Sequence, residues 1–114
     1  MNYELEIGVE EAKEMAKQGR QIFVFVSNPS ELEFVGEMLG AAEKVHDIDF
    51  GDARQIIFKE GEKESLEKMG RIYRDGIIVC PHGRSSLKFA SALSEMGIKA
   101  YSLKGGIEGM RSRA

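Results

Sequence analysis

The stretch from Gly76 to Leu93, GIIVCPHGRSSLKFASAL, constrains the fold of this chain more than any other. A run of β-branched residues ends at the only cysteine, Cys80, and a short polar segment then leads into a helical pattern of apolar residues. This pattern predicts a buried strand, a tight loop and a helix. Open α/β sheets bind ligands at the carboxyl ends of their strands, and a loop entering a helix there directs backbone N–H groups toward Cys80. Such a loop would stabilise the ionised form of Cys80, so Cys80 is a candidate nucleophile, with a small buried residue of the core as the alternative.

The rest of the chain alternates between strand patterns and helix patterns. Besides the strand before Cys80, strands are expected at Tyr3 to Ile7, Ile22 to Val26, Lys44 to Phe50 and Lys99 to Leu103. Helices are expected at Val9 to Gln18, from Ser30 to about Gly40, at Glu62 to Arg74, after the Cys80 loop, and at Glu108 to Arg113. The run from Asp52 to Glu60 fits either a short helix or an extended piece. Such alternation predicts one α/β domain over 1–114 with a parallel sheet and helices on both faces.

The composition narrows the class of protein further. The chain has 114 residues, of which 42% are hydrophobic, and a net charge of −3, which is typical of a soluble globular domain. There is no basic stripe for nucleic acid, no apolar run of the ~18 residues needed to cross a membrane, and no signal-peptide pattern. A single cysteine cannot form an internal disulfide, so we expect a reducing, cytoplasmic environment.

Two motifs carry a resemblance to a known family, the loop CPHGRSS at 80–86 and the segment YSLKGGIEGM at 101–110. With the helix between them they resemble the active-site loop, following helix and closing segment of a rhodanese-like domain, without gaps from Gly76 to Met110. The resemblance implies a five-stranded sheet with the cysteine strand at its centre. It also implies a sulfurtransferase without a cofactor, in which Cys80 takes sulfur from thiosulfate, polysulfide or a persulfidated protein and passes it to a thiol or cyanide.

Five loop residues beside the catalytic Cys80 are expected to bind the substrate, namely His82, Gly83, Arg84, Ser85 and Ser86. Backbone N–H groups of residues 82–86 would hold an anionic persulfide if the loop curls around it, and Gly83 relaxes the backbone there. Arg84, the only cation of the loop, would hold an anionic donor, and His82 would donate to an anion or shuttle a proton. Ser85 and Ser86 are expected to cap the following helix, and their hydroxyls are also able to face the pocket.

The chain departs from the family pattern at several positions. The family's loop arginine lies five residues after the cysteine, where this chain has Ser85, and the segments at 25–29 and 36–41 lack the family's acidic-basic pair and histidine. These departures favour an alternative, a catalytically weak or inactive module that binds a partner or an anion or senses redox state. A cysteine phosphatase related to the cell-cycle phosphatases is a further alternative, but it needs an arginine where Ser86 stands.

A cluster of possible metal ligands lies at His46, Asp47, Asp49 and Asp52. Neighbouring residues of a strand point to opposite faces, so His46 and Asp47 cannot readily share an ion. We therefore expect no metal site.

Overall fold

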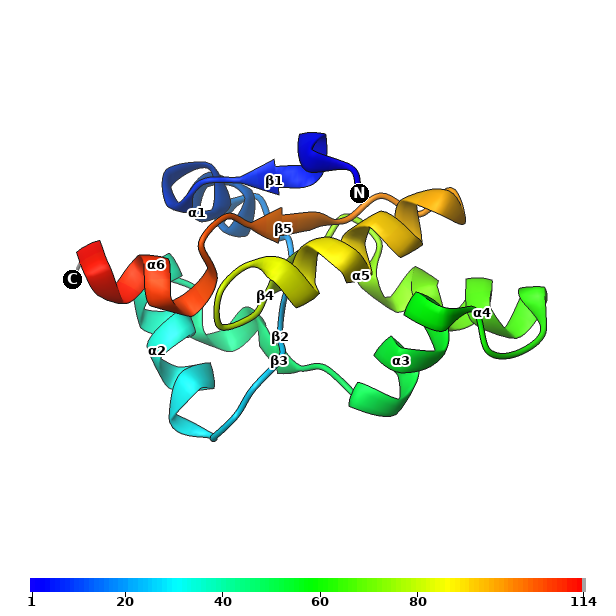
Figure 1. Ribbon diagram of the computed structural model, residues 1–114. Coiled ribbons are helices and arrows are strands. Elements are labelled where there is room, and N and C mark those ends of the chain that lie inside the picture. Colours follow the sequence, from blue (N-terminus) through cyan, green and yellow to red (C-terminus); the bar gives the residue numbers. More distant parts are fainter. Residues whose placement is uncertain (114) are drawn as a thin grey trace.

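A five-stranded, all-parallel sheet lies at the centre of the computed structural model, which describes residues 1–113 (Figure 1). The spatial order is β1-β5-β4-β2-β3, so β4, the strand before Cys80, is central. The strands are short: β1 (Glu6–Ile7), β2 (Ile22–Val24), β3 (Val45–Asp47), β4 (Ile77–Val79) and β5 (Tyr101–Leu103). The predicted α/β class is confirmed, and the architecture is compatible with a rhodanese-like fold.

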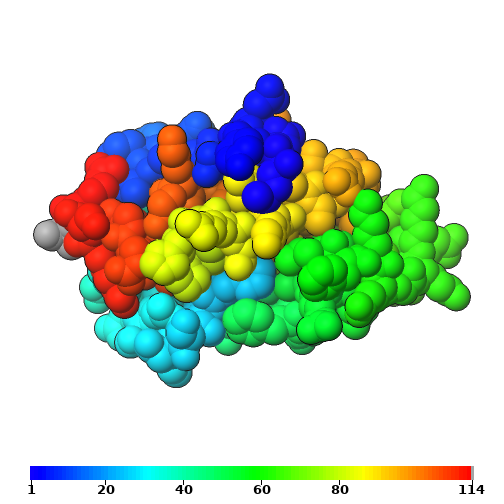
Figure 2. Space-filling view, in the orientation of Figure 1, coloured from blue at the N-terminus to red at the C-terminus, as the bar shows by residue number. Residues whose placement is uncertain are grey.

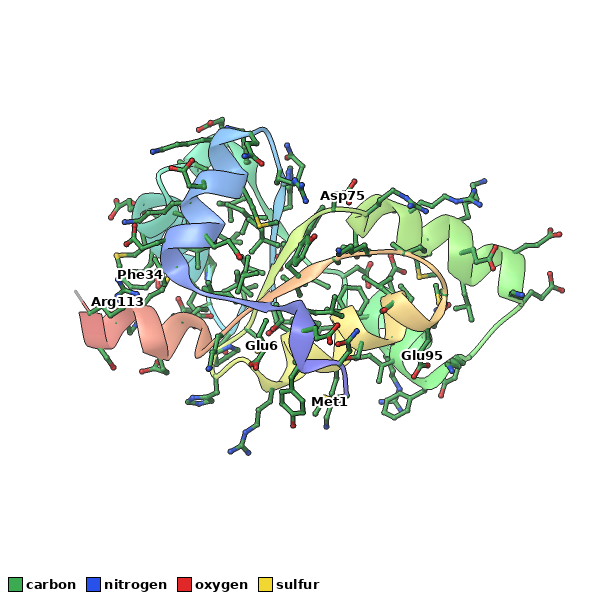
Figure 3. All side chains as sticks on the ribbon, turned by 90° about the horizontal axis from the view of Figure 1, so that it is seen from above. Met1, Glu6, Phe34, Asp75, Glu95 and Arg113 are labelled. Atoms are coloured by element: carbon green, nitrogen blue, oxygen red, sulfur yellow. The ribbon has the colours of Figure 1, made fainter. Side chains whose placement is uncertain are left out.

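Within residues 1–113, six α-helices cover the two faces of the sheet (Figure 1). One apolar core lies between the sheet and the helices α1 (Val9–Lys17), α2 (Ser30–Leu39) and α6 (Gly106–Arg113). A second core lies between the opposite face and the helices α3 (Phe50–Phe58), α4 (Lys63–Gly70) and α5 (Arg84–Glu95). Seen from above, Phe34 of α2 lies near Arg113 of α6, and the Arg111 guanidinium is 5.5 Å from the Phe34 ring centre (Figure 3).

Residues 77–80 alternate between the two cores. Ile77 and Val79 belong to the core beneath α1, α2 and α6, whereas Ile78 and Cys80 belong to the core beneath α3, α4 and α5. Successive side chains of a strand point to opposite faces, so the strand itself determines the layer in which the cysteine lies. Cys80 is thereby placed in the same layer as α5, the helix that its own loop enters.

The predicted strand at Tyr3 to Ile7 is wrong over its first three residues. Tyr3–Leu5 forms a 3-10 helix, η1, and only Glu6–Ile7 pairs with β5. The side chain of Asn2 explains the difference, because its Oδ1 accepts a hydrogen bond from the Glu4 N–H at 3.1 Å and stabilises a turn. Apolar alternation was therefore a weaker determinant here than a local side-chain cap.

The predicted strand at Lys44 to Phe50 is also shorter than expected, since Phe50 begins α3. Asp49 Oδ1 accepts hydrogen bonds from the N–H groups of Gly51, at 2.8 Å, and Asp52, at 3.2 Å, which caps that helix. The ambiguous run from Asp52 to Glu60 is thus mostly helical. Short 3-10 helices also occur: η2 (Ala42–Lys44) precedes β3, and η3 (Arg71–Tyr73) replaces the end of the helix expected from Glu62 to Arg74.

Over residues 1–113, no helix has both the length and the apolar character that crossing a membrane requires.

Candidate functional site

The sulfur of Cys80 lies inside the loop that joins β4 to α5. Only 1% of the residue is exposed, and its Sγ accepts hydrogen bonds from the N–H groups of Gly83, at 3.1 Å, and Ser86, at 3.3 Å. Gly83 precedes the first helical residue and has a φ of 87°, a left-handed conformation that turns the chain sharply. The sulfur therefore lies at the N-terminus of α5, where N–H donors and the helix dipole favour negative charge.

A pair of buried serine hydroxyls continues the hydrogen bonding from the sulfur. The Cys80 thiol donates to Ser86 Oγ at 3.2 Å, and Ser86 Oγ lies 2.7 Å from Ser102 Oγ on β5. Neither serine is exposed to solvent. A hydroxyl both donates and accepts, so this chain of hydrogen bonds can reverse its direction when the thiol becomes ionised.

The role expected of Ser85 and Ser86 as helix caps is wrong. The residue at the cap position is Gly83, and no side chain caps α5. Ser86 instead turns inward because the curl of the loop brings both its N–H and its hydroxyl to the sulfur. Sequence reasoning also missed Ser102, whose available signal is a polar side chain inside the otherwise apolar strand Tyr101–Leu103.

The segment that follows β5, beginning at Gly105-Gly106, holds the Cys80 loop in place through backbone hydrogen bonds. The N–H groups of Ile107 and Glu108 donate to the carbonyl oxygens of Cys80 and Pro81, both at 2.9 Å. A Cβ added at Gly106 would overlap the Cys80 carbonyl oxygen, and φ at Gly106 is +59°. The close approach of the two segments therefore requires glycine at Gly106, which gives a physical reason for this part of the LKGGI motif.

A pocket of about 200 Å³ opens beside the sulfur and is lined by Cys80, Pro81, His82, Arg84 and Ser85. The side chains of His82, Arg84 and Ser85 are exposed. Within residues 1–113, Arg84 forms no ion pair, so its guanidinium is available to an anion in the pocket. The structure thus brings all six predicted site residues together: Gly83 and Ser86 contact the sulfur, and the others line the pocket.

The possible metal ligands are engaged separately. His46 Nε2 lies 2.6 Å from Gln21 Oε1, and Asp49 caps α3. In the part of the chain that the structure describes, no three His, Cys, Asp or Glu side chains gather in a way that would hold a metal ion.

A buried tyrosine lies in the same core as Cys80. The ring of Tyr73 meets those of Phe23 and Phe89 edge to face, each at 4.8 Å between ring centres. Burial, together with the negative charges of Asp52 and Asp49, raises the pKa of Tyr73 to about 12. Tyr73 therefore stays neutral at physiological pH, and it does not line the pocket at Cys80.

The groups around Cys80 interact favourably with negative charge on its sulfur. Two N–H donors and a hydroxyl contact the sulfur, and Arg84, which forms no ion pair within residues 1–113, lies at the pocket. In comparisons with known proteins, no protein-family model, no curated protein and no solved structure matches this chain.

Proposed function

We propose that this protein is a rhodanese-type sulfurtransferase that moves a sulfane sulfur through a persulfide on Cys80. The Cys80 thiolate attacks the outer sulfur of thiosulfate, whose S–S bond breaks. Sulfite leaves with the electron pair of that bond, and Cys80 keeps the outer sulfur as an anionic persulfide. A thiolate or cyanide then attacks the terminal sulfur, which restores the Cys80 thiolate and releases a persulfide or thiocyanate.

The hydrogen bonding at Cys80 Sγ is the observation that carries this proposal. Sγ already accepts bonds from the N–H groups of Gly83 and Ser86, at 3.1 and 3.3 Å. Donors fixed by the backbone stabilise a thiolate and the persulfide derived from it without rearrangement. Arg84, without an ionic partner within residues 1–113, supplies positive charge for thiosulfate or for the anionic end of a persulfidated protein.

The proposal also concerns the cellular location of the protein and its partners. A nucleophilic cysteine keeps its free thiol in a reducing compartment, so we propose a cytoplasmic location. The partners are a sulfur donor and a thiol acceptor rather than nucleic acid, because the net charge is −3 and the sequence has no basic stripe.

A second candidate is a module that binds an anion or a partner without turnover. The burial of Cys80, with 1% of the residue exposed, favours it, because a donor must reach the sulfur through the small pocket. Ser85 also stands where the resemblance implies an arginine, which removes one cation from the loop.

Intact-protein mass spectrometry separates the two candidates. The wild-type protein is incubated with thiosulfate or polysulfide beside Cys80→Ser, and then treated with cyanide. We expect the wild type alone to gain one sulfur, which cyanide releases as thiocyanate. If alkylation shows the Cys80 thiol to be accessible and yet no sulfur is gained, the sulfurtransferase proposal is wrong and the binding module remains.

A further inference from the structure

Ser102 is a buried hydroxyl on β5 that lies beneath the beginning of α5. Figure 2 shows α5 at the surface on this face of the molecule, whereas Ser102 is 0% exposed. Within residues 1–113, its Oγ has one hydrogen-bond partner, Ser86 Oγ at 2.7 Å. A hydroxyl taken out of water costs free energy unless its hydrogen bonds are made, so a serine is an unfavourable choice for packing alone at this position.

The three polar groups Cys80 Sγ, Ser86 Oγ and Ser102 Oγ are joined by two side-chain contacts, at 3.2 Å and 2.7 Å. With a neutral thiol, three hydrogen atoms share these two contacts, so one of them has no acceptor within residues 1–113. With a thiolate, two hydrogen atoms remain, and both are used when Ser102 donates to Ser86 and Ser86 donates to the sulfur. The hydrogen bonding of this buried row is therefore complete only for the ionised cysteine.

We propose that Ser102 is a positioning residue for the Cys80 thiolate. When the thiol gives up its proton to water, the Ser86 hydroxyl turns its O–H to Sγ and becomes a third donor beside the N–H groups of Gly83 and Ser86. Ser102 then donates to Ser86 Oγ, which holds the Ser86 O–H toward the sulfur and polarises it. This inference rests on the proposed function for its use, because the thiolate is the form that attacks a sulfur donor.

Other charged or titratable groups also lie around the loop. His82 and Arg84 line the pocket at the sulfur, and Glu108 of α6 donates its N–H to the Pro81 carbonyl oxygen. On the side of α3, Arg54 lines a neighbouring pocket with Phe50, Phe58 and Ser85, and Tyr73 lies in the same core as Cys80, near Asp49 and Asp52. A substitution at Ser102 changes none of these groups, so a comparison between variants isolates the effect of its hydroxyl.

A titration of the thiolate tests the proposal without any sulfur transfer. The ultraviolet absorbance of the thiolate is followed against pH, and the same titration of a Cys80→Ser background is subtracted to remove the tyrosines. We expect Ser102→Ala to lower the ratio of thiolate to thiol about threefold at a given pH, because the Ser86 donor is no longer oriented. Ser91→Ala is the matched control, since Ser91 is a buried serine of α5 whose Oγ accepts a hydrogen bond from the Asn2 N–H and has none to the sulfur within residues 1–113.

A double-mutant cycle separates positioning through Ser86 from a merely structural role. Ser86→Ala should lower the ratio about tenfold, because it removes the hydroxyl donor itself. Ser102→Ala should then have no further effect in the Ser86→Ala protein, since Ser102 acts through that hydroxyl. An unchanged ratio in Ser102→Ala, or the same threefold loss in both backgrounds, would overturn the inference. A wild type that gains no sulfur from thiosulfate would refute the proposed function and leave the result of this titration intact.

Discussion

Two loops at the same edge of the sheet use different acceptors for the hydrogen bonds of their backbone N–H groups. The loop after β2 leads into α2, and the loop after the neighbouring strand β4 leads into α5. In the first, the N–H groups of Ser27 and Asn28 donate to the carboxylate of Glu31, which is 6% exposed and belongs to α2 itself. In the second, the N–H groups of Gly83 and Ser86 donate to the sulfur of Cys80.

The difference lies in the acceptor. Parallel strands that feed helices produce N–H-rich loops with a preference for negative charge at each such edge. After β2 the acceptor is the side-chain carboxylate of Glu31, which is not a nucleophile towards sulfur. After β4 the acceptor is a thiol, which gains negative charge only on ionisation and is then a nucleophile. The same backbone arrangement thus serves stability in one loop and, in our proposal, reactivity in the other.

The largest effect on stability is expected from Gly106→Ala. This substitution would disturb the loop after β4 and leave the loop after β2 unchanged. The new Cβ would overlap the Cys80 carbonyl oxygen, and Ala would have to adopt a φ of +59°. We expect the free energy of unfolding to fall by about 3 kcal/mol or more, measured by urea denaturation. Gly109→Ala is the matched control, because its Cβ would meet only ordinary contacts in the same helix, the nearest at 3.7 Å. Equal stability of the two variants would contradict the close approach of α6 to the loop.

Stability at alkaline pH reports on the core that contains Cys80, because Tyr73 belongs to this core and not to the core beneath α2. Tyr73 has a pKa of about 12 in the folded protein against 10.0 for an ordinary tyrosine. Between these values the unfolded chain has released a proton that the folded protein retains, so stability falls as the pH rises through this window. We expect a total loss of about 2.5 kcal/mol, of which about half is reached by pH 11.

Tyr73→Phe isolates this contribution, since it keeps the ring packing and removes the titrating hydroxyl. Urea denaturation of both proteins at about pH 9 and about pH 11 gives the difference directly. The variant should lose less stability than the wild type on going to the higher pH. Parallel losses in the two proteins would show that Tyr73 is not held neutral by its surroundings.

The smallest effect is expected in the β2 loop. Glu31→Ala removes the acceptor of the Ser27 and Asn28 N–H groups and should cost about 2 kcal/mol, whereas Glu31→Gln keeps one oxygen and should cost about 1 kcal/mol. Urea denaturation measures both, with Glu33→Ala as the control, since Glu33 is an exposed acidic residue of the same helix turn. The comparison between the loops fails if Glu31→Ala is as stable as Glu33→Ala.

The predictable parts of the fold are those that depend on residues close together in the chain. The strand Ile77–Val79, the turn at Gly83 and the helix that follows are all encoded within one short stretch, and the alternation of patterns indicated a parallel sheet. Prediction failed where a cap competed with apolar periodicity, at Asn2 and at Asp49. A hydrogen bond from a nearby N–H to a side-chain oxygen is a short-range interaction, but the apolar pattern of the sequence does not show which of two local preferences is stronger.

The candidate site likewise has features that neighbouring residues determine and features that distant segments determine. By itself, the sequence determined that Cys80 ends a buried strand and enters a glycine-containing loop at a helix N-terminus, because these features follow from neighbouring residues. Only the tertiary structure decided that Ser86 turns inward to Ser102, that Gly106 lies against the Cys80 carbonyl, and that α3 places its phenylalanines beside Ser85. Each of these contacts joins segments that are separate in the chain, and the folding of the sheet and the packing of its helices bring them together.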